Sequence, residues 1–220
     1  MVLWLSCDKE DVDYDICPDK NHPHIIDLGL PSGTKWSCCN VGANSPDEYG
    51  SYFAWGETSP KDSYDWSNYK WCNGDFHMLT KYCIESGYGP YGPFDYKNVL
   101  DLTDDAAYVN CGSMWRMPSR EQQDELRSEC NWQWTSMNGV NGYLVSSKRS
   151  DASLFLPAAG RYFEDLLYYD GSYVHYWSRT LDVEDPSRAY YLGFDSSNVG
   201  WGNGSRDYGQ SVRAVFFSQQ

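Results

Sequence analysis

The second half of this chain is a succession of short runs in which large apolar or aromatic residues alternate with smaller or polar ones. The runs are separated by segments rich in Gly, Ser, Asp and Asn, and they cover residues 142–145, 154–157, 173–178, 189–194 and 211–217. Such runs are typical of β-strands, and short turn-rich connections between them favour antiparallel pairing. The sequence therefore predicts a C-terminal half built from small antiparallel sheets.

Helical patterns are scarce in the sequence, and two segments carry them. Ser119 and Gln122 have the spacing of a capping box, and apolar residues follow at helical spacing, which predicts a helix over about 119–130. Residues 103–108 predict a second helix, in which the Thr103 hydroxyl caps the first turn and acidic residues favour the N-terminal end. Together with the strands, these segments predict an α+β fold with two helices.

The N-terminal end differs in composition from the rest of the chain. Residues 1–24 are polar and acidic, lack periodicity and contain the helix breakers Pro18 and Pro23. These features predict a polar N-terminal arm or linker, followed by a single domain over residues 25–220.

Two further features are predicted at the start of this domain. Short β-like runs at 25–28 and 35–38 flank the turn-forming residues 31–33, which indicates a hairpin. Residues 44–75 are rich in Gly, Pro, Ser and Asp but also in aromatic rings, too many for a solvated linker. We expect them to form long ordered loops fixed by buried rings.

The charge of the chain limits its partners. Lys and Arg total 17 and Asp and Glu total 31, which gives a formal net charge of −14. This charge repels phosphate backbones, and no basic cluster opposes it, so we expect no nucleic-acid partner. No apolar stretch is long enough to cross a bilayer, and residues 1–8 lack the charged and apolar regions of a signal peptide.

Cysteine and histidine spacing gives no metal motif. Eight cysteines are present without a Cys-x-x-Cys pair, and Cys38 and Cys39 are adjacent, so buried free thiols are the favoured interpretation and one or two disulfides the alternative. The four histidines are too dispersed for a cluster that the sequence alone would show; they are His22, His24, His77 and His175. We therefore expect no metal and no other cofactor.

Between residues 169 and 217 the chain alternates regular segments with a scatter of small, charged and aromatic residues that share no periodicity and no chemical theme. A surface that mixes framework and contact residues in this way is suited to recognition. Within it, residues 200–205 carry three glycines, whose backbone entropy makes them poor strand and helix formers. They predict a loop that is held by its flanks.

Seven motifs, read in order, resemble a known family. They are DLGLPSGTKW at 27–36, CNVGA at 39–43, YFAWGET at 52–58, WRMPS at 115–119, LFLPAAG at 154–160, YWS at 176–178 and SVR at 211–213. In these motifs the chain resembles the Fibrobacter succinogenes major paralogous domain, which is common in gut Bacteroidales and belongs with the C-type-lectin-like folds. The resemblance spans about residues 25–217 and implies that fold.

The C-terminal segment also resembles the variable region of proteins diversified by diversity-generating retroelements. That resemblance implies a ligand-binding protein, not an enzyme, with a hypervariable surface over about residues 169–207 and an unknown protein or glycan on a cell surface as its partner. It implies display on a cell surface or a phage virion. The implied framework is Trp177, Tyr190, Leu192, Val212 and Val215. The implied ligand-binding residues are Asp170, Ser172, Tyr173, Val174, His175, Arg179, Asp182, Glu184, Asp185, Ser187, Arg188, Gly193, Asp195, Gly200, Trp201, Gly202, Gly204, Ser205 and Asp207.

Three other functions compare less well with the sequence. A calcium-dependent sugar site is not expected, because the carboxylate and amide motifs that resemble such sites are absent, and the nearest segments are 184–186 and 201–203. An invariant adhesive or glycan-binding surface domain of the same family is the main alternative. An oxidase similar to formylglycine-generating enzymes is less expected, because every cysteine precedes residue 131, and the pair Asp104 and Asp105 is explained as helix N-terminal acids.

Overall fold

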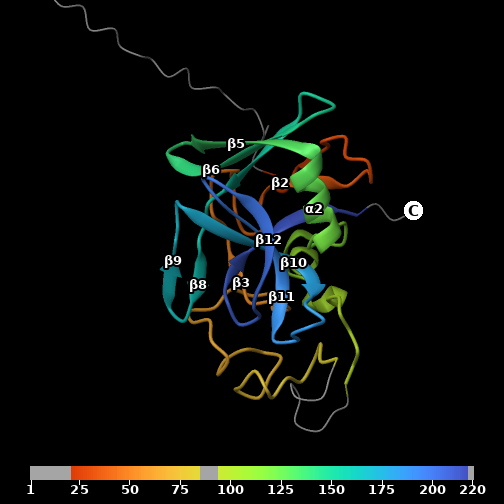
Figure 1. The fold of residues 1–220 in the computed structure, drawn as a ribbon, viewed down its shortest axis with the longest axis vertical. Coiled ribbons are helices and arrows are strands. Elements are labelled where there is room, and N and C mark those ends of the chain that lie inside the picture. Colours follow the sequence, from red (N-terminus) through yellow and green to blue (C-terminus); the bar gives the residue numbers. More distant parts are fainter. Residues whose placement is uncertain (1–20, 85–93, 218–220) are drawn as a thin grey trace, which may run out of the picture.

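A computed structural model describes residues 21–84 and 94–217. The chain is an α+β protein of small sheets, mostly antiparallel, with two α-helices, as predicted (Figure 1). Residues 1–20 of the predicted polar arm, which contain Cys7 and Cys17, lie outside the described residues. The sheets meet around a shared aromatic core that includes Trp36, Tyr64 and Tyr176.

Four sheets make up the part of the chain that the structure describes. The four-stranded sheet has the order β1 (Ile25–Ile26), β2 (Lys35–Asn40), β14 (Arg213–Phe216), β4 (Trp115–Arg116). The five-stranded sheet has the order β12 (Val199–Ser205), β11 (Arg188–Asp195), β10 (Tyr173–Leu181), β13 (Gln210–Ser211), β3 (Tyr52–Phe53). The remaining sheets are β5 (Cys130–Met137), β6 (Val140–Ser147), β7 (Ser153–Pro157), and the hairpin β8 (Arg161–Phe163), β9 (Leu166–Tyr168).

The predicted N-terminal hairpin is confirmed. Strands β1 and β2 pair antiparallel, with Ile26 opposite Trp36. The turn between them closes with a hydrogen bond of 2.8 Å from the Gly33 amide to the Leu30 carbonyl, and Gly33 has a φ of +75°, which glycine adopts without strain. The C-terminal strand β14 then pairs with the other edge of β2, so the two ends of the domain share one sheet.

The helix predicted over 119–130 is α2 (Arg120–Glu129), and its capping box is present. The Gln122 amide donates to the Ser119 hydroxyl at 3.3 Å, and the Ser119 amide donates to the Gln122 side chain at 2.9 Å. Each of these two hydrogen bonds satisfies a backbone amide that has no partner within the first turn of the helix. The prediction from spacing alone is therefore correct to one residue at each end.

The second helix, α1 (Ala106–Cys111), follows a 3₁₀ turn η1 (Leu102–Asp104), and its predicted cap is wrong. The cap is Asp105, not Thr103, because the Asp105 carboxylate accepts hydrogen bonds from the Ala107 and Tyr108 amides. The carboxylate also accepts from the Met117 amide at 2.9 Å, which joins the helix to β4. Asp105 is thus a helix N-terminal acid as predicted.

Its neighbour Asp104 has another role. The Asp104 carboxylate is buried and accepts from the Tyr82 hydroxyl at 2.7 Å and from the Lys81 ammonium at 2.5 Å. It therefore holds the end of the long loop region and does not cap the helix.

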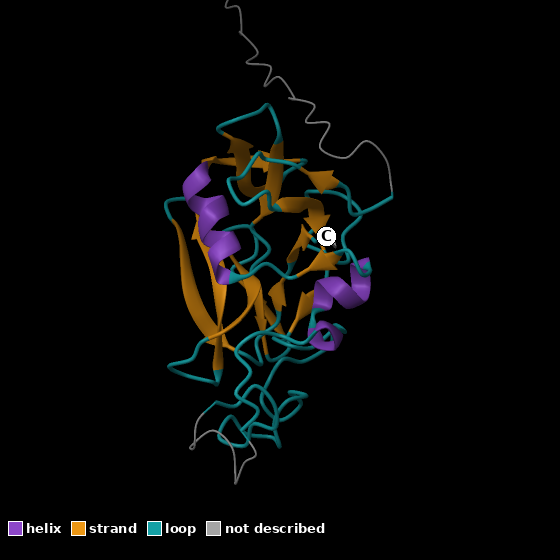
Figure 2. Cartoon of the chain, turned by 90° about the vertical axis from the view of Figure 1, so that its right-hand side faces the viewer, coloured by secondary structure: helices purple, strands orange, loops and turns teal. Residues whose placement is uncertain are grey.

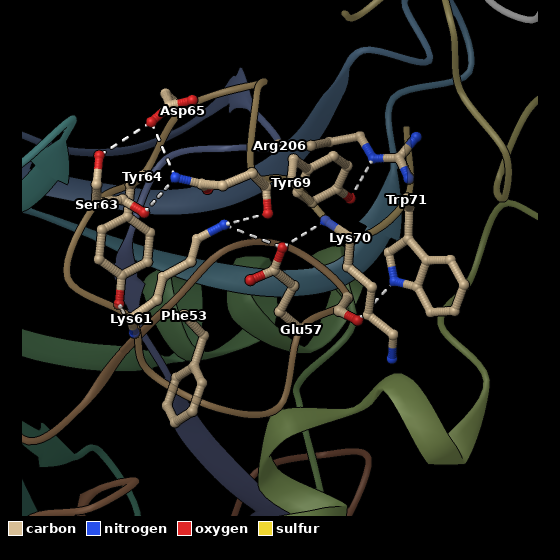
Figure 3. Close-up of polar contacts among 12 residues, drawn as sticks. Phe53, Glu57, Lys61, Ser63, Tyr64, Asp65, Tyr69, Lys70, Trp71 and Arg206 are labelled. Carbon is tan, nitrogen blue, oxygen red and sulfur yellow. Dashed lines mark hydrogen bonds and ion pairs between the residues drawn. The ribbon is translucent and has the colours of Figure 1, made fainter. Parts of the chain in front are cut away.

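Residues 44–75 form long loops interrupted only by the short strand β3, and loops make up the lower end of the molecule in Figure 2. Buried rings fix these loops, as expected. Trp55, Tyr64 and Tyr69 are buried, and the guanidinium of Arg206, which is 0% exposed, reaches into the loops from the turn after β12 (Figure 3). Its Nε donates to the Tyr69 hydroxyl at 2.9 Å, and its other nitrogens donate to the carbonyls of Lys81, Tyr82 and Pro186.

A second set of contacts closes the same loops. The Glu57 carboxylate accepts from the Lys61 ammonium at 3.1 Å and from the Lys70 amide at 2.8 Å (Figure 3). These polar contacts replace the backbone ladder that the loops lack, which is why so long a stretch without regular structure is ordered.

The boundary predicted for the N-terminal arm is wrong at its last residues. Residues 21–24 pack along β2, where the Cys38 amide donates to the His24 carbonyl at 3.0 Å. The sequence showed no histidine cluster, but the structure places both His22 and His24 against the Cys38 side chain. Among the other described cysteines, Cys72, Cys111 and Cys130 are free thiols, as predicted.

Candidate functional site

The segment that was predicted to be a glycine-rich loop is the edge strand β12. It pairs antiparallel with β11 from Arg188 opposite Ser205 to Phe194 opposite Val199. The unbroken ladder supplies the backbone hydrogen bonds that offset the entropy cost of ordering the glycines. The prediction of a loop over 200–205 is therefore wrong.

The glycines of β12 are explained by the ring of Tyr191 on the neighbouring strand. A Cβ placed at Gly202 would lie 2.9 Å from the Tyr191 hydroxyl oxygen, and one at Gly204 would lie 3.2 Å from its ring. A Cβ at Gly193 on β11 would lie 2.9 Å from the same ring. The three glycines thus leave the space that the Tyr191 ring occupies against the sheet. Their lack of a side chain is required by packing.

The register of β10, β11 and β12 sorts the predicted binding residues onto opposite faces of the sheet. Directly opposed residues in antiparallel strands point to the same side. One side carries Tyr173, His175, Tyr191, Gly193, Asp195, Gly200, Gly202 and Gly204, and we call it the Tyr191 face. The other side carries Tyr190, Trp201 and Asn203 beside helix α2, so the predicted residues do not form one patch.

The Tyr191 face has a cluster of three rings at its centre. The His175 ring lies 4.7 Å from the Tyr173 ring and 4.2 Å from the Tyr191 ring, the latter edge to face. Tyr173 and Tyr191 are half-buried, while His175 is buried between them. Burial, followed by the nearby charge of Arg161, lowers the pKa of His175 to about 3. His175 is therefore a neutral imidazole on this face at physiological pH.

Several buried polar atoms on this side of the sheet have no partner among the described protein groups. They are Nδ1 of His175, Nε of Arg161 and both amide atoms of Gln210. Gln210 precedes Ser211, which pairs with Tyr176, so it lies along β10 beside His175, and its amide also approaches Gly204. Buried polar atoms without partners cost free energy, so water or a bound ligand is expected to satisfy them.

The hairpin β8–β9 borders the Tyr191 face and was not predicted to belong to it. Its outer surface and the residue after it expose four large side chains, those of Phe163, Leu166, Tyr168 and Tyr169. The Arg161 guanidinium lies 4.8 Å from the Tyr208 ring and 5.9 Å from the Tyr169 ring, which connects the hairpin to the turn after β12. The exposed aromatic surface thus begins at Phe163, upstream of the predicted boundary at 169.

The hairpin is rigidly attached despite its exposure. Tyr162 and Gly209 exchange two backbone hydrogen bonds, and Tyr64 and Glu164 exchange another two at 2.8 and 2.9 Å. The signal that could have found this segment is the short alternating run before and after Glu164, which has the turn chemistry of a hairpin.

On the opposite side, Trp201 is 49% exposed and stacks on Arg120 of α2. The Arg120 guanidinium lies 3.7 Å from the Trp201 ring and 4.3 Å from the Tyr190 ring. Tyr190, which was assigned to the buried framework, is half-exposed and belongs to this outer stack. Trp177, Leu192, Val212 and Val215 are buried, as the framework assignment requires.

Several predicted contact residues lie in the interior. Val174 is buried beneath the sheet in the aromatic core, because its strand position faces the side opposite His175. Asp182 is buried as a hydrogen-bond acceptor for the Tyr190 hydroxyl, the Glu184 amide and the Asn203 side chain. Ser187 and Asp207 are also buried. These four residues cannot contact a ligand at the surface, and their assignment to the contact set is corrected.

Gly193 and Gly204 are buried beneath the Tyr191 ring and His175 between two rings, and the other predicted residues lie at or near the surface. Asp170, Ser172, Glu184 and Arg188 are exposed, and Arg179, Asp185, Asp195, Gly200 and Ser205 are half-buried. Glu184, Asp185 and Arg188 gather at the turn between β10 and β11, where Arg188 forms an ion pair of 3.2 Å with Asp185. This turn is separate from the ring cluster of the Tyr191 face.

The buried Asp207 gives a prediction on pH dependence. Burial raises the pKa of Asp207 from 3.8 to about 6, so between these values the folded chain keeps a proton that the unfolded chain has released. Asp207 therefore lowers the free energy of unfolding as the pH rises. Its favourable contribution is complete below about pH 4, and about 3 kcal/mol is lost as the pH rises through about 6. We expect Asp207→Asn to remove this dependence and to raise the free energy of unfolding by about 1–2 kcal/mol at pH 8.

Urea unfolding at about pH 4.5 and about pH 8 measures this difference. Asp195→Asn is the matched control, because hydrogen bonds from Ser197 and Asn198 lower the pKa of Asp195 and give its contribution the opposite sign. An Asp207→Asn protein that loses stability in parallel with the wild type between the two pH values would contradict the assignment.

In comparisons with protein-family models, with curated proteins and with solved structures, the chain matches none of them. Within residues 21–84 and 94–217, no helix has the length and apolar character needed to cross a membrane. The structure thus defines an α+β protein whose largest sheet carries an aromatic face with unmatched buried polar atoms.

Proposed function

We propose that this chain is a non-enzymatic recognition protein with a C-type-lectin-like fold, which binds a protein or glycan ligand through the Tyr191 face and the adjoining β8–β9 hairpin. The observation that carries the proposal is the gathering of accessible aromatic side chains there, those of the half-buried Tyr173 and Tyr191 on the sheet and of the exposed Phe163, Tyr168 and Tyr169 at the hairpin. An exposed aromatic surface of this kind favours binding at this place over other parts of the surface.

The side chains of this face suit molecular recognition. Tyrosine supplies a large contact area with a polar end at a small cost in conformational entropy, and arginine adds directional donors. Tyr169, Tyr173, Tyr191, Tyr208 and Arg161 provide both on or beside a β-sheet. Because the pKa of His175 is lowered to about 3, its buried imidazole is neutral and packs between the two tyrosine rings without adding charge to the face.

We further propose that this surface is diversified, as in the variable proteins that the chain resembles. The strand ladders and the buried Leu192 and Phe194, which point to the side opposite Tyr191, hold the sheet from below, so outward side chains can change without loss of the core. The proposal includes the half-exposed Tyr173 and Asp195 as variable positions and excludes the buried Val174, Asp182, Ser187 and Asp207.

A binding experiment tests the site. We expect the double variant Tyr173→Ala/Tyr191→Ala to lose at least about tenfold in affinity for a glycan or surface protein that binds the wild-type chain on a glycan array or on a surface-protein extract. Trp201→Ala is the matched control, because it removes an exposed aromatic ring from the opposite side of the same sheet. Loss of binding in the control alone would place recognition on the α2 side.

A genomic observation tests the diversification separately. We expect a template repeat near the gene that differs from the coding segment mainly at template adenines, with the differing codons concentrated at outward positions. Binding without such a repeat would instead support the alternative of an invariant adhesive or glycan-binding domain.

A further inference from the structure

A second cluster of chemically reactive side chains lies far from the Tyr191 face in the chain, where residues 22–24 run along strand β2. Nδ1 of His22 is 3.3 Å from Sγ of Cys38, and Nδ1 of His24 is 3.6 Å from the same sulfur. The sulfurs of Cys38 and Cys39 are 3.7 Å apart. Donor atoms of His22, Cys38 and Cys39 all lie within 4.8 Å of one another.

An irregularity in β2 accounts for two adjacent cysteines on one side of a strand. Consecutive strand residues normally point to opposite faces. Here Asn40 pairs with Arg213 and Trp36 pairs with Val215, so three residues of β2 (37–39) stand opposite the single Ala214. The Ser37 hydroxyl fills the gap by accepting from the Ala214 amide and donating to the Cys39 carbonyl. Such bulges redirect side chains.

The distances from Cys38 Sγ to the other three donor atoms are those of a tetrahedral metal site, and the donor atoms of His22, Cys38 and Cys39 are also within mutual reach of one ion. Zinc binds thiolate sulfur at about 2.3 Å and imidazole nitrogen at about 2.0–2.1 Å, so a regular tetrahedron has edges of about 3.8 Å between two sulfurs and about 3.6 Å between sulfur and nitrogen. The distances from Cys38 Sγ to Cys39 Sγ, to His24 Nδ1 and to His22 Nδ1 are 3.7, 3.6 and 3.3 Å. Tetrahedral sites of two sulfurs and two nitrogens favour zinc.

The surroundings have the character of a closed structural site. Cys38 and Cys39 are buried against Leu144 and Phe155, while the two imidazoles close the outer side and are half-buried. The His24 amide donates to Cys38 Sγ at 3.1 Å, a contact that a thiolate would strengthen. The Arg213 guanidinium, which donates to the Cys38 carbonyl at 2.8 Å, adds positive charge below the cluster.

We propose that His22, His24, Cys38 and Cys39 form a structural zinc site that fastens residues 22–24 to strand β2. Binding converts both thiols to thiolates, so one Zn²⁺ enters and two protons leave, with no change of oxidation state. The site is independent of the recognition face, because its four ligands lie outside that sheet.

The experiment uses the full chain, purified under reducing conditions and dialysed against Zn²⁺ or Co²⁺. We expect about one zinc per chain by elemental analysis, and a Co²⁺ form with the visible absorption bands and sulfur-to-cobalt charge transfer of a tetrahedral thiolate site. Cys38→Ser, Cys39→Ser and His22→Gln should each lower metal affinity by at least about tenfold. Cys72→Ser and Cys130→Ser are the matched controls, because these thiols lie on the loop before residue 75 and at the start of β5, outside the cluster.

Thermal unfolding supplies a second measurement that does not depend on the buried cysteine variants folding well. The half-buried His22→Gln should fold, and added zinc should raise the midpoint temperature of the wild type but not of this variant. A reduced wild-type chain that takes up neither Zn²⁺ nor Co²⁺ would overturn the proposal. So would control variants that lose metal as completely as Cys38→Ser does.

Discussion

Arg213→Leu is expected to lower the free energy of unfolding by about 3–5 kcal/mol, the largest effect of any substitution proposed for this chain. Arg213 is 1% exposed, and its guanidinium donates to the carbonyls of Ser37, Cys38 and Phe155 and to the Asn40 side chain. Leucine has a suitable volume but no donors, so these acceptors would remain buried without partners. Each such group costs about 1–3 kcal/mol.

The effect should be global, because the acceptors of Arg213 come from β2 and β7 while Arg213 itself lies on β14. Denaturant unfolding measures it, and Arg188→Leu is the matched control, since Arg188 is exposed and pairs only with neighbouring surface groups. A loss for Arg213→Leu within about 0.5 kcal/mol of the control would show that the guanidinium does not join the sheets.

Arg206→Leu is expected to destabilise the chain by a similar amount, about 3–4 kcal/mol, but with a local signature. The Arg206 guanidinium donates to Tyr69 and to three carbonyls, and its central carbon lies 5.0 Å from the Trp55 ring. Because the loops over 56–82 have little ladder of their own, losing this anchor should release them before the sheets unfold.

Limited proteolysis and hydrogen exchange distinguish the two cases. Cleavage and exchange in Arg206→Leu should rise first within residues 56–82, whereas Arg213→Leu should expose all sheets together. Tyr69→Phe is a milder matched variant, because it removes only the hydroxyl that meets Arg206. Uniform exchange across the chain in Arg206→Leu would contradict a local anchoring role.

Parts of the fold could be predicted from the sequence because their causes are local. The Ser119 capping box, the turn at Gly33 and the alternation in the five C-terminal runs each act within a few residues, and each predicted element is present. Strand β12 was missed for the same reason. Local propensity disfavours its glycines, and the ring that makes them suitable belongs to Tyr191 on another strand.

Which residues share the candidate site depends on the pairing register of strands β10, β11 and β12, and composition does not show that register. The scatter over 169–207 predicted a surface, but only strand pairing separates His175 and Tyr191 from Trp201 on the opposite side and directs Val174 inward. Arg161 and Gln210 were missed because their importance comes from unpartnered atoms, and those follow from the packing around them.

The residue types of short segments thus determined the local structure. They predicted where helices begin, where the N-terminal hairpin turns and that the aromatic-rich loops are ordered. Tertiary packing settled which side each residue faces and which distant residues meet. His22 and His24 were assigned to a polar arm, yet the fold brings the donor atoms of His22, Cys38 and Cys39 within 4.8 Å of one another beside a bulge opposite Ala214. The reason is physical: pairing register and bulges arise between strands, and no single strand contains that information.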